Sequence, residues 1–292
     1  MTTVHVLRRP PTRRGGPPAA APELRDTFRG LGVDMVDLTG ETAAASSQTL
    51  REAIEEGVVE RVAIVGGDGL VHLAVQALAE SGIPLTILPS GTGNDFAAAL
   101  GIHEPNPASV LLPPSPVDLL RVSRDSEHVR WIASVAIAGF PAQINERANR
   151  IRFPIGGMVY TLAAIAELPR FTRRRFDIEV DGEQLSTDSA MLAIGNTCFM
   201  GGGMLVCPDA TPTDGQAHLT TIEGVGRLGL LRHLVSQRGG TADRPEVLRR
   251  TAQQVILHGP TTDVWGDGEY VGALPLRIDV VPGALAVTLP EA

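Results

Sequence analysis

The sequence predicts two domains: an α/β domain with a parallel sheet, followed by a domain of antiparallel β structure. Short β-branched runs alternate with helical stretches over residues 1–112, which is typical of a parallel sheet covered by helices on both faces. Five prolines in residues 104–118 (EPNPASVLLPPSPVD) indicate a boundary, and strand-like runs dominate beyond it. A chain of 292 residues is long enough for two such domains.

Four short runs predict the strands of the parallel sheet: Val4–Leu7, Val33–Leu38, Val62–Val65 and Leu85–Pro89. Between them, apolar residues at helical spacing predict two helices, over residues 47–57 and 70–82, each ending at a glycine. Ligands of such sheets bind at the carboxyl ends of the strands. We therefore expect a binding site where the third and fourth strands end.

The second half contains runs that predict antiparallel strands, with Asp181–Gly182 as the turn of a hairpin. These runs are residues 119–124, 129–139, 176–196 and 217–222. Helical insertions are expected near residues 155–168 and 228–237. Two final strands, residues 275–281 and 284–290, could belong to either domain.

The composition excludes several classes of function. With 43% apolar and 20% charged residues the chain is typical of a soluble globular protein, and a net charge of −8 excludes a generic nucleic-acid binder. All 25 basic residues are arginine, which excludes catalysis by lysine. Cys198 and Cys207 form no metal-binding or disulfide pattern and are interpreted as buried thiols. No secretory signal or membrane span is visible, so a cytoplasmic protein is expected, with any membrane contact peripheral.

A cluster of glycines follows the third predicted strand and precedes a helix. Gly66, Gly67, Asp68 and Gly69 lie where successive backbone N–H groups and a helix N-terminus can bind an anion. Glycine has no Cβ to block the close approach of a bulky ligand. A purely structural turn is the alternative interpretation.

A second glycine loop follows the fourth strand, with Ser90, Gly91, Thr92 and Gly93 ahead of a helix that begins at Asn94–Asp95. The Thr92 hydroxyl could donate to a phosphate oxygen. Two such loops at neighbouring strand ends would line one crevice, as a nucleoside triphosphate requires. For Asn94 and Asp95 the alternative is a helix N-cap.

Near the C-terminus, the sequence GDGE offers two carboxylates, Asp267 and Glu269. On an extended segment, residues two apart point to the same face, so these side chains could share a site for acid–base chemistry. The alternative is an Asp-Gly turn between two strands, with Glu269 after the turn and exposed to solvent.

Together these motifs resemble the catalytic domain of diacylglycerol kinases, in the superfamily that includes NAD kinases and sphingosine kinases. The resemblance rests on GGDG at 66–69, SGTGNDFA at 90–97, the N…GGG…DG pattern of residues 196–222, and residues 265–290. It implies a Rossmann-like nucleotide-binding α/β domain over residues 1–118 and a β-sandwich lipid-substrate domain over residues 119–281. The last strands, about residues 282–292, would return to the first domain.

The resemblance also implies an activity, an ATP-dependent lipid kinase that transfers the γ-phosphate to the hydroxyl of diacylglycerol or a related lipid alcohol. The alternatives are an NAD kinase-like or sphingosine kinase-like enzyme, or a catalytically impaired nucleotide-binding regulatory protein. Leu70, His72 and Leu73 motivate the last alternative, because they replace the Thr, Asn and Glu that usually follow the family's GGDG.

Roles for individual residues follow from the resemblance. Glu269 would accept the proton of the attacking hydroxyl with Asp267 beside it, and Asp68 would polarise metal or water at the phosphates of ATP. A structural Mg²⁺ would bind at Thr211, Asp214 and Gln216. The nucleotide would contact Thr39, Gly66, Gly67, Asp68, Gly69, Leu70, His72, Ser90, Gly91, Thr92, Gly93, Asn94 and Asp95.

The expected partners are a lipid substrate and an anionic membrane surface. Seven arginines but a single acidic residue, Glu167, lie between Arg147 and Arg175, with apolar residues among them. Basic and apolar side chains together favour docking on anionic lipid, although a solvated basic face is equally compatible with the charge. No nucleic-acid partner is expected, and a homodimer stays possible.

Overall fold

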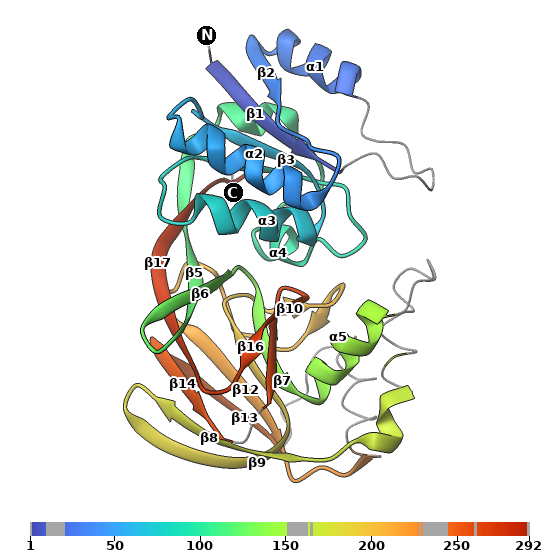
Figure 1. The fold of residues 1–292 in the computed structure, drawn as a ribbon, viewed down its shortest axis with the longest axis vertical. Helices are drawn as coiled ribbons and strands as arrows, with labels where there is room; N and C mark the ends of the chain where they lie inside the picture. The colour runs from blue at the N-terminus through green and yellow to red at the C-terminus, as the bar shows by residue number, and fades with distance from the viewer. Residues whose placement is uncertain are drawn as a thin grey trace. The chain divides into compact units, whose positions relative to one another are not determined.

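The computed structural model describes residues 2–9, 21–150, 163, 166–227, 229, 245–259 and 262–290 of the 292-residue chain. The chain divides into two compact units. The first unit consists of Met1–Val117 and Pro282–Ala292, and the second of Asp118–Val281. Figure 1 follows the chain through both units, each of which is considered by itself below.

The first unit is built on a parallel sheet. Its strands are β1 (Thr2–Arg8), β2 (Val33–Asp37), β3 (Val62–Gly66) and β4 (Leu85–Pro89), in the order β2-β1-β3-β4. The end of β17 (Leu276–Thr288) pairs in parallel with β4 where Val287 meets Leu85. The parallel α/β fold predicted from the alternating pattern is confirmed, including all four strands.

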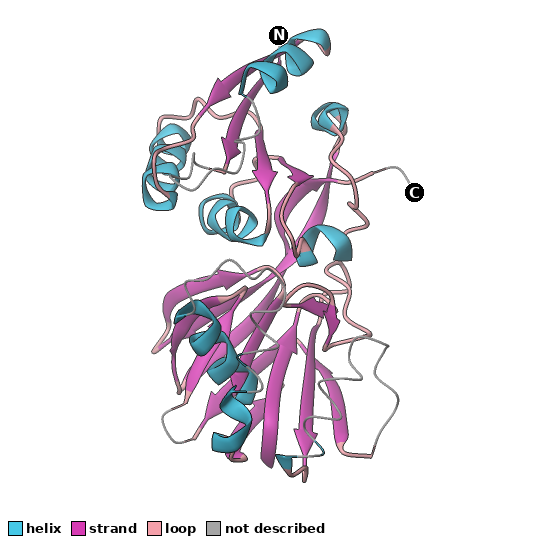
Figure 2. Cartoon of the chain, turned by 90° about the vertical axis from the view of Figure 1, so that its right-hand side faces the viewer, coloured by secondary structure: helices cyan, strands magenta, loops and turns pink. Residues whose placement is uncertain are grey.

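Helices cover both faces of this sheet (Figure 2). On one face, Phe28 of α1 (Ala21–Gly30) and Val110 of the short helix η1 (Pro107–Leu111) share a core with alternate residues of β1 and β3. On the other face, α2 (Ala43–Glu55) packs against α3 (Asp68–Leu78). The short helix α4 (Asp95–Ala99) follows β4.

The second unit is antiparallel β structure with one long helix among its described residues. One run of strands is β16-β15-β7-β9-β8-β14-β17, while β12 and β13 extend from β9, and β5 and β6 form a hairpin. Asp181 and Gly182 form the predicted hairpin turn between β8 and β9, both with positive φ. The bounds are β5 Pro114–Arg124, β6 Glu127–Ile132, β7 Val135–Gly139, β8 Arg174–Val180, β9 Glu183–Gly195, β10 Phe199–Met200, β11 Met204–Leu205, β12 Ala217–Glu223, β13 Val247–Ala252, β14 Gln254–His258, β15 Asp263–Gly266 and β16 Glu269–Ala273.

Two apolar clusters hold the strands of this unit together. The larger cluster joins inward-facing side chains of the strands, such as Val122, Phe176 and Leu192. The smaller cluster lies on the opposite face of β7 and β9, where the helix α5 (Phe140–Arg150) packs through Phe140 and Ile144. This arrangement agrees with the predicted β-sandwich.

Several elements differ from the sequence prediction: α1 and the strands β13 to β16 were not predicted, and the run 129–139 divides into β6 and β7. The final residues form one strand, β17, instead of two, because Pro282 and Gly283 are accommodated within it. Helix α5 was not predicted. It directly follows the strand-like run 129–139, and no helix was assigned to residues 140–150 from the sequence. Most residues of the predicted helices at 228–237 and 155–168 lie outside the described residues. The short helix η2 (Leu168–Arg170) begins where the second of these was expected to end.

Candidate functional site

The first glycine loop lies, as predicted, between the end of β3 and the start of α3. Gly66 is the last residue of β3 and Gly67 the N-cap of α3. The first N–H groups of an α-helix lack intrahelical partners and carry a partial positive charge. In the eleven-residue helix α3 these include the N–H groups of Asp68 and Gly69. Gly69 is exposed, and a Cβ there would meet no atom within 4 Å. This helix start is accessible to an anion.

Two of the glycines are required by contact between the loops. A Cβ on Gly67 would lie 2.9 Å from Cα of Gly91, and a Cβ on Gly91 would lie 2.6 Å from Cα of Gly67. The two backbones therefore touch, which only glycine permits. The contact between the loops accounts for Gly67 and Gly91, and Gly69 remains available to a ligand.

The second glycine loop has fewer free donors than its sequence implied. The N–H of Ser90 donates to the Gly66 carbonyl, the N–H of Gly91 donates to Oδ1 of Asn94, and the Asn94 amide donates back to the Gly91 carbonyl. Within the described residues, Thr92 and Gly93 have no such partner. Thr92 is exposed, so its hydroxyl is available to a ligand.

Asn94 and Asp95 do not form a simple N-cap. Asn94 adopts the left-handed conformation, with φ of 58°, and its side chain does not cap α4. The cap comes instead from Asp68, whose Oδ2 accepts the Asn94 N–H at 2.8 Å. Asp95 is buried, with 7% exposure. Asp68 therefore links the two glycine loops.

Burial raises the pKa of the Asp68 carboxyl, and the neighbouring Asp95 carboxylate raises it further. Backbone N–H groups of Asn94, Phe96 and Asp95 act in the opposite direction without cancelling these effects. Oδ1 of Asp68 is buried without a hydrogen-bond partner. A cation brought in with a nucleotide would satisfy this oxygen and favour the ionised form.

Thr39 lies beyond the end of β2, in a polar group with Arg8 and Asp37. Its hydroxyl accepts the Arg8 N–H at 3.1 Å, and the Arg8 guanidinium forms an ion pair with Asp37 at 2.9 Å. Burial alone would raise the pKa of Asp37, but hydrogen bonds from Thr39 and Arg8 outweigh it and lower that pKa. Thr39 is thus held in place by this group at the carboxyl end of the sheet.

The residues that depart from the family motif lie along α3. His72 and Leu73 are buried, with 7% and 9% exposure, and Leu70 is half-buried beside Gly66. Leu73 therefore serves the packing of the helix. The structure provides no evidence that His72 contacts a nucleotide.

The GDGE segment forms a tight turn, so the expectation of an extended segment was wrong. Asp267 and Gly268 have φ of 51° and 84° and join β15 to β16, where Gly266 pairs with Glu269. Positive φ at both central residues of a two-residue hairpin loop is the property that Asp-Gly favours. The argument that side chains two apart share a face therefore does not apply.

The two acids of this turn have different surroundings. The carboxylate of Asp267 accepts the N–H groups of Ala133 and Ser134, both at 2.8 Å. Glu269 is exposed, and its carboxylate forms no hydrogen bond or ion pair with any described residue. Asp267 thus fastens the turn to the β6–β7 connection, whereas the Glu269 carboxylate is available to a substrate.

The predicted cation residues surround one carboxylate that already has several partners. Oδ1 of Asp214 accepts the Gln216 N–H at 2.9 Å, and its Oδ2 lies 3.1 Å from the Thr211 hydroxyl and 2.8 Å from Nε2 of His218. No group of three or more His, Cys, Asp or Glu side chains among the described residues could hold a metal. The Asp214 carboxylate is therefore held by Thr211, Gln216 and His218, and the predicted Mg²⁺ site stays a prediction.

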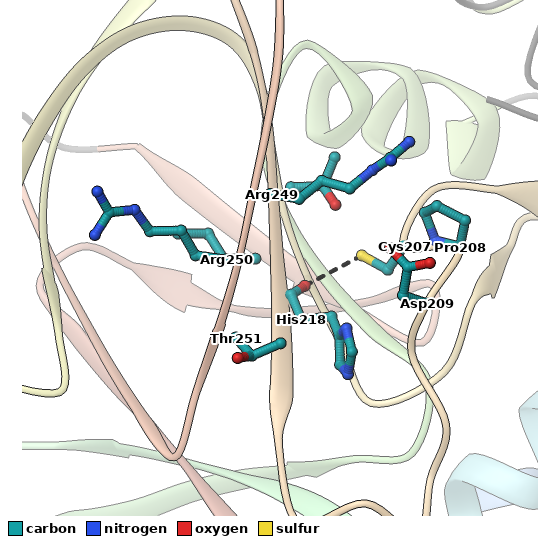
Figure 3. Close-up of a pocket in the computed structure, with 9 residues that line it drawn as sticks. Cys207, Pro208, Asp209, His218, Arg249, Arg250 and Thr251 are labelled. Atoms are coloured by element: carbon teal, nitrogen blue, oxygen red, sulfur yellow. Dashed lines mark hydrogen bonds between the residues drawn. The ribbon is translucent and has the colours of Figure 1, made fainter. Parts of the chain in front are cut away.

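A pocket of about 330 Å³ opens beside this loop. Its lining comes from residues 207–209, 218–220 and 249–251 (Figure 3). Burial raises the pKa of the Cys207 thiol to about 12, and its Sγ donates to the His218 carbonyl. The prediction of a buried thiol is confirmed for Cys207 and wrong for Cys198, which is half-buried. None of the residues predicted for nucleotide binding or proton transfer lines this pocket.

Comparison with known proteins identifies the family. The diacylglycerol kinase catalytic domain matches residues 14–121, and the YegS C-terminal NAD kinase beta sandwich-like domain matches residues 134–289. A diacylglycerol kinase of Mycobacterium tuberculosis is 35% identical over 295 residues, covering 99% of this chain and 95% of its own. The chain belongs to the diacylglycerol kinase family of lipid kinases.

A further relative agrees with this assignment, and a solved structure shows the same fold. A probable YegS-like lipid kinase of Stenotrophomonas maltophilia is 33% identical over 297 residues, covering 94% of each chain. A crystal structure of a diacylglycerol kinase from Bacillus anthracis has the same fold, with a TM-score of 0.71 at 16% identity and coverage of 99% and 97%. In the part of this family member that the structure describes, no helix is sufficiently long and apolar to span a bilayer.

Sequence reasoning missed two polar residues close to the GDGE turn. Asn196 is completely buried and donates to the carbonyls of Asp118 and Ala133, and the Asp118 carboxylate accepts the Gly215 N–H. Asn196 was noted only as part of a family pattern, and Asp118 only as the end of a proline-rich boundary. No local pattern distinguishes them, because their partners are far away in the sequence.

Proposed function

We propose that this protein is an ATP-dependent lipid kinase that transfers the γ-phosphate of ATP to the hydroxyl of diacylglycerol or a related lipid alcohol. The nucleotide phosphates would bind the start of α3 at Asp68–Gly69 and the Thr92 hydroxyl. Mg²⁺ would arrive with ATP as part of the substrate, and the unsatisfied Oδ1 of Asp68 supports its approach to this helix start. Family membership supports the reaction class.

The observation that carries the proposed mechanism is the exposed carboxylate of Glu269, which has no partner among the described residues and lies next to a turn held by Asp267. Glu269 would take the proton of the lipid hydroxyl as its oxygen attacks the γ-phosphorus, and ADP would leave. Asp267 would hold the turn without touching the substrate, because both of its oxygens accept backbone N–H groups. The product would be a lipid phosphate, a precursor type in phospholipid biosynthesis.

The test is phosphoryl transfer from radiolabelled ATP to a panel of acceptors. The panel contains diacylglycerol, monoacylglycerol, sphingosine and NAD, each with Mg²⁺. We expect label in a lipid phosphate and none in NAD. Label in NAD alone would identify the NAD kinase-like alternative, and no label in any acceptor would support the impaired regulatory protein.

We also propose peripheral binding to anionic membranes through the arginine-rich segment. The structure reduces the free charge assumed from the sequence, because Arg147 pairs with Glu167, Arg173 with Asp188 and Arg175 with Asp177. Phe171 does not face a membrane, since it is buried and packs edge-on against Phe140 at 5.4 Å. Arg152 and the apolar residues 151–158 lie outside the described residues. The exposed Arg170 and the half-buried Arg174 remain as the described candidates for lipid contact.

A further inference from the structure

Three connections of the second unit meet at one end of its sheet. Strand β15 is antiparallel to β7, and β7 is antiparallel to β9. The end of β15, the start of β7 and the end of β9 therefore lie at the same end of the sheet. These ends carry the Asp267–Gly268 turn, the Ala133–Ser134 connection and Asn196.

Asn196 holds these connections together from a site with no exposure to solvent. Its backbone N–H donates to the Ser134 carbonyl at 2.8 Å. Its side-chain amide donates to the carbonyls of Asp118 and Ala133, each at 2.8 Å. Two carbonyl acceptors fix the orientation of the amide, because only the NH₂ group can satisfy both.

The hydrogen bonds continue from Asn196 in two directions. Ala133 and Ser134, whose carbonyls Asn196 binds, donate their own N–H groups to the Asp267 carboxylate, two residues before Glu269. Asp118 exchanges backbone and side-chain hydrogen bonds with Pro212 and Gly215. One buried amide therefore lies between the turn that carries Glu269 and the loop that contains Asp214.

We propose that Asn196 is a positioning residue for Glu269. It fixes the Ala133–Ser134 connection, which fixes the Asp267 carboxylate and hence the direction in which the turn presents Glu269. This inference rests on the proposed function, in which Glu269 accepts the proton. A displacement of about 1 Å at a reacting group can cost about 10²-fold in rate.

The experiment compares Asn196→Ala with Ser189→Ala. Ser189 is a matched control, because it is also fully buried, and its hydroxyl contacts two carbonyl oxygens in the same unit, those of Met191 and Ile222. Both variants are assayed well below their melting temperatures. We expect Asn196→Ala to lower kcat about 10²-fold with little change in KM for ATP, and Ser189→Ala to keep the wild-type kcat.

A second measurement does not depend on activity. Hydrogen exchange of the Ala133 and Ser134 amides, which donate to Asp267, is expected to accelerate in Asn196→Ala and not in Ser189→Ala. Should Asn196→Ala fail to fold, Asn196→Ser replaces it, because serine retains one hydroxyl donor. The kcat of Asn196→Ser is expected to lie below that of the wild type, by less than the roughly 10²-fold expected for Asn196→Ala.

The possible results are distinguishable. Equal kcat in the wild type and a folded Asn196 variant, or equal exchange rates in the two alanine variants, would overturn the positioning role. If the wild type phosphorylates no acceptor, the proposed function fails, and the exchange rates still decide whether Asn196 holds the turn.

Discussion

Two carboxylates of the candidate site differ in what surrounds them. Asp68 is largely enclosed, caps a neighbouring helix and has a raised pKa, whereas Glu269 is exposed and has no partner among the described residues. The first arrangement organises the backbone, and the second leaves a carboxylate exposed, as the proposed proton acceptor requires. The sequence identified both as acids of the site but did not separate these roles.

Asp68→Asn tests the first role. Because folding raises the pKa of Asp68 above its ordinary value of 3.8, its contribution to stability is present below that pH and is lost as pH rises through the folded pKa. The asparagine keeps an oxygen for the Asn94 N–H and has no charge to bury. We therefore expect the melting temperature of the variant, relative to wild type, to increase between about pH 3.5 and pH 7.

Asp68→Ala is the companion variant, since it removes the cap of α4 as well as the charge. It should be less stable than Asp68→Asn, by about 1 kcal/mol, the usual cost of losing a cap. A relative melting temperature of Asp68→Asn that is independent of pH would contradict the raised pKa.

Asp214 leads to a second prediction at this scale. Since its oxygens are already bound by Gln216, Thr211 and His218, we expect chelator to leave the melting temperature of the wild type unchanged. His218→Ala frees Oδ2 and is expected to introduce a response to added Mg²⁺. A chelator-dependent melting temperature in the wild type would contradict this and would favour the structural Mg²⁺ that the family resemblance implied.

At the scale of elements, the contact between the glycine loops gives a matched pair of variants. Gly67→Ala places a Cβ 2.9 Å from the Gly91 backbone, so we expect it to separate the loops and to lower both stability and ATP affinity. Gly69→Ala meets no atom within 4 Å in the first turn of α3 and is expected to keep or raise stability, by up to about 1 kcal/mol.

ATP binding separates the two glycine roles. If phosphate approaches the start of α3, Gly69→Ala should weaken ATP binding while the fold stays intact, as measured by calorimetry alongside thermal melting. Unchanged ATP affinity in Gly69→Ala would place the phosphates elsewhere.

The predictability of elements depended on how local their determinants are. β4 was predicted with its observed bounds and the Asp181–Gly182 turn at its observed position, because hydrophobic runs and turn residues act locally. The single strand β17 was not predicted, because its pairing with distant strands continues past Pro282–Gly283. Helix α5 was not predicted, because it is stabilised by burial of Phe140 in a cluster with residues of β7 and β9. The Asn196 hydrogen bonds join residues up to 78 positions apart, beyond any sequence motif.

At the scale of the whole molecule, a protein of net charge −8 must present a local basic surface to bind anionic lipid. We expect the double variant Arg170→Glu/Arg174→Glu to weaken binding to phosphatidylglycerol vesicles, by about 1 kcal/mol or more for each arginine that lies near the lipid. Binding by the wild type should also weaken with salt. Arg51→Glu, on the exposed surface of α2, is the control for reversing an arginine outside the arginine-rich segment.

Activity assays show whether the two arginines act at the membrane or elsewhere in the protein. The double variant should lose more activity on vesicles than on a short-chain soluble substrate, while Arg51→Glu should lose little on either. Equal losses on both substrates would mean that the two arginines serve the fold or the active site.

The central claim, that this lipid kinase uses Glu269 as its base, is tested by Glu269→Gln beside Glu127→Gln. Both glutamates are exposed and directly follow a two-residue hairpin turn with positive φ, Asp267–Gly268 and Asp125–Ser126. The account predicts that Glu269→Gln lowers kcat on the lipid acceptor about 10²–10⁴-fold with ATP affinity retained, and that Glu127→Gln matches the wild type. A Glu269→Gln variant with wild-type kcat, or one that keeps kcat and loses ATP affinity, would contradict it.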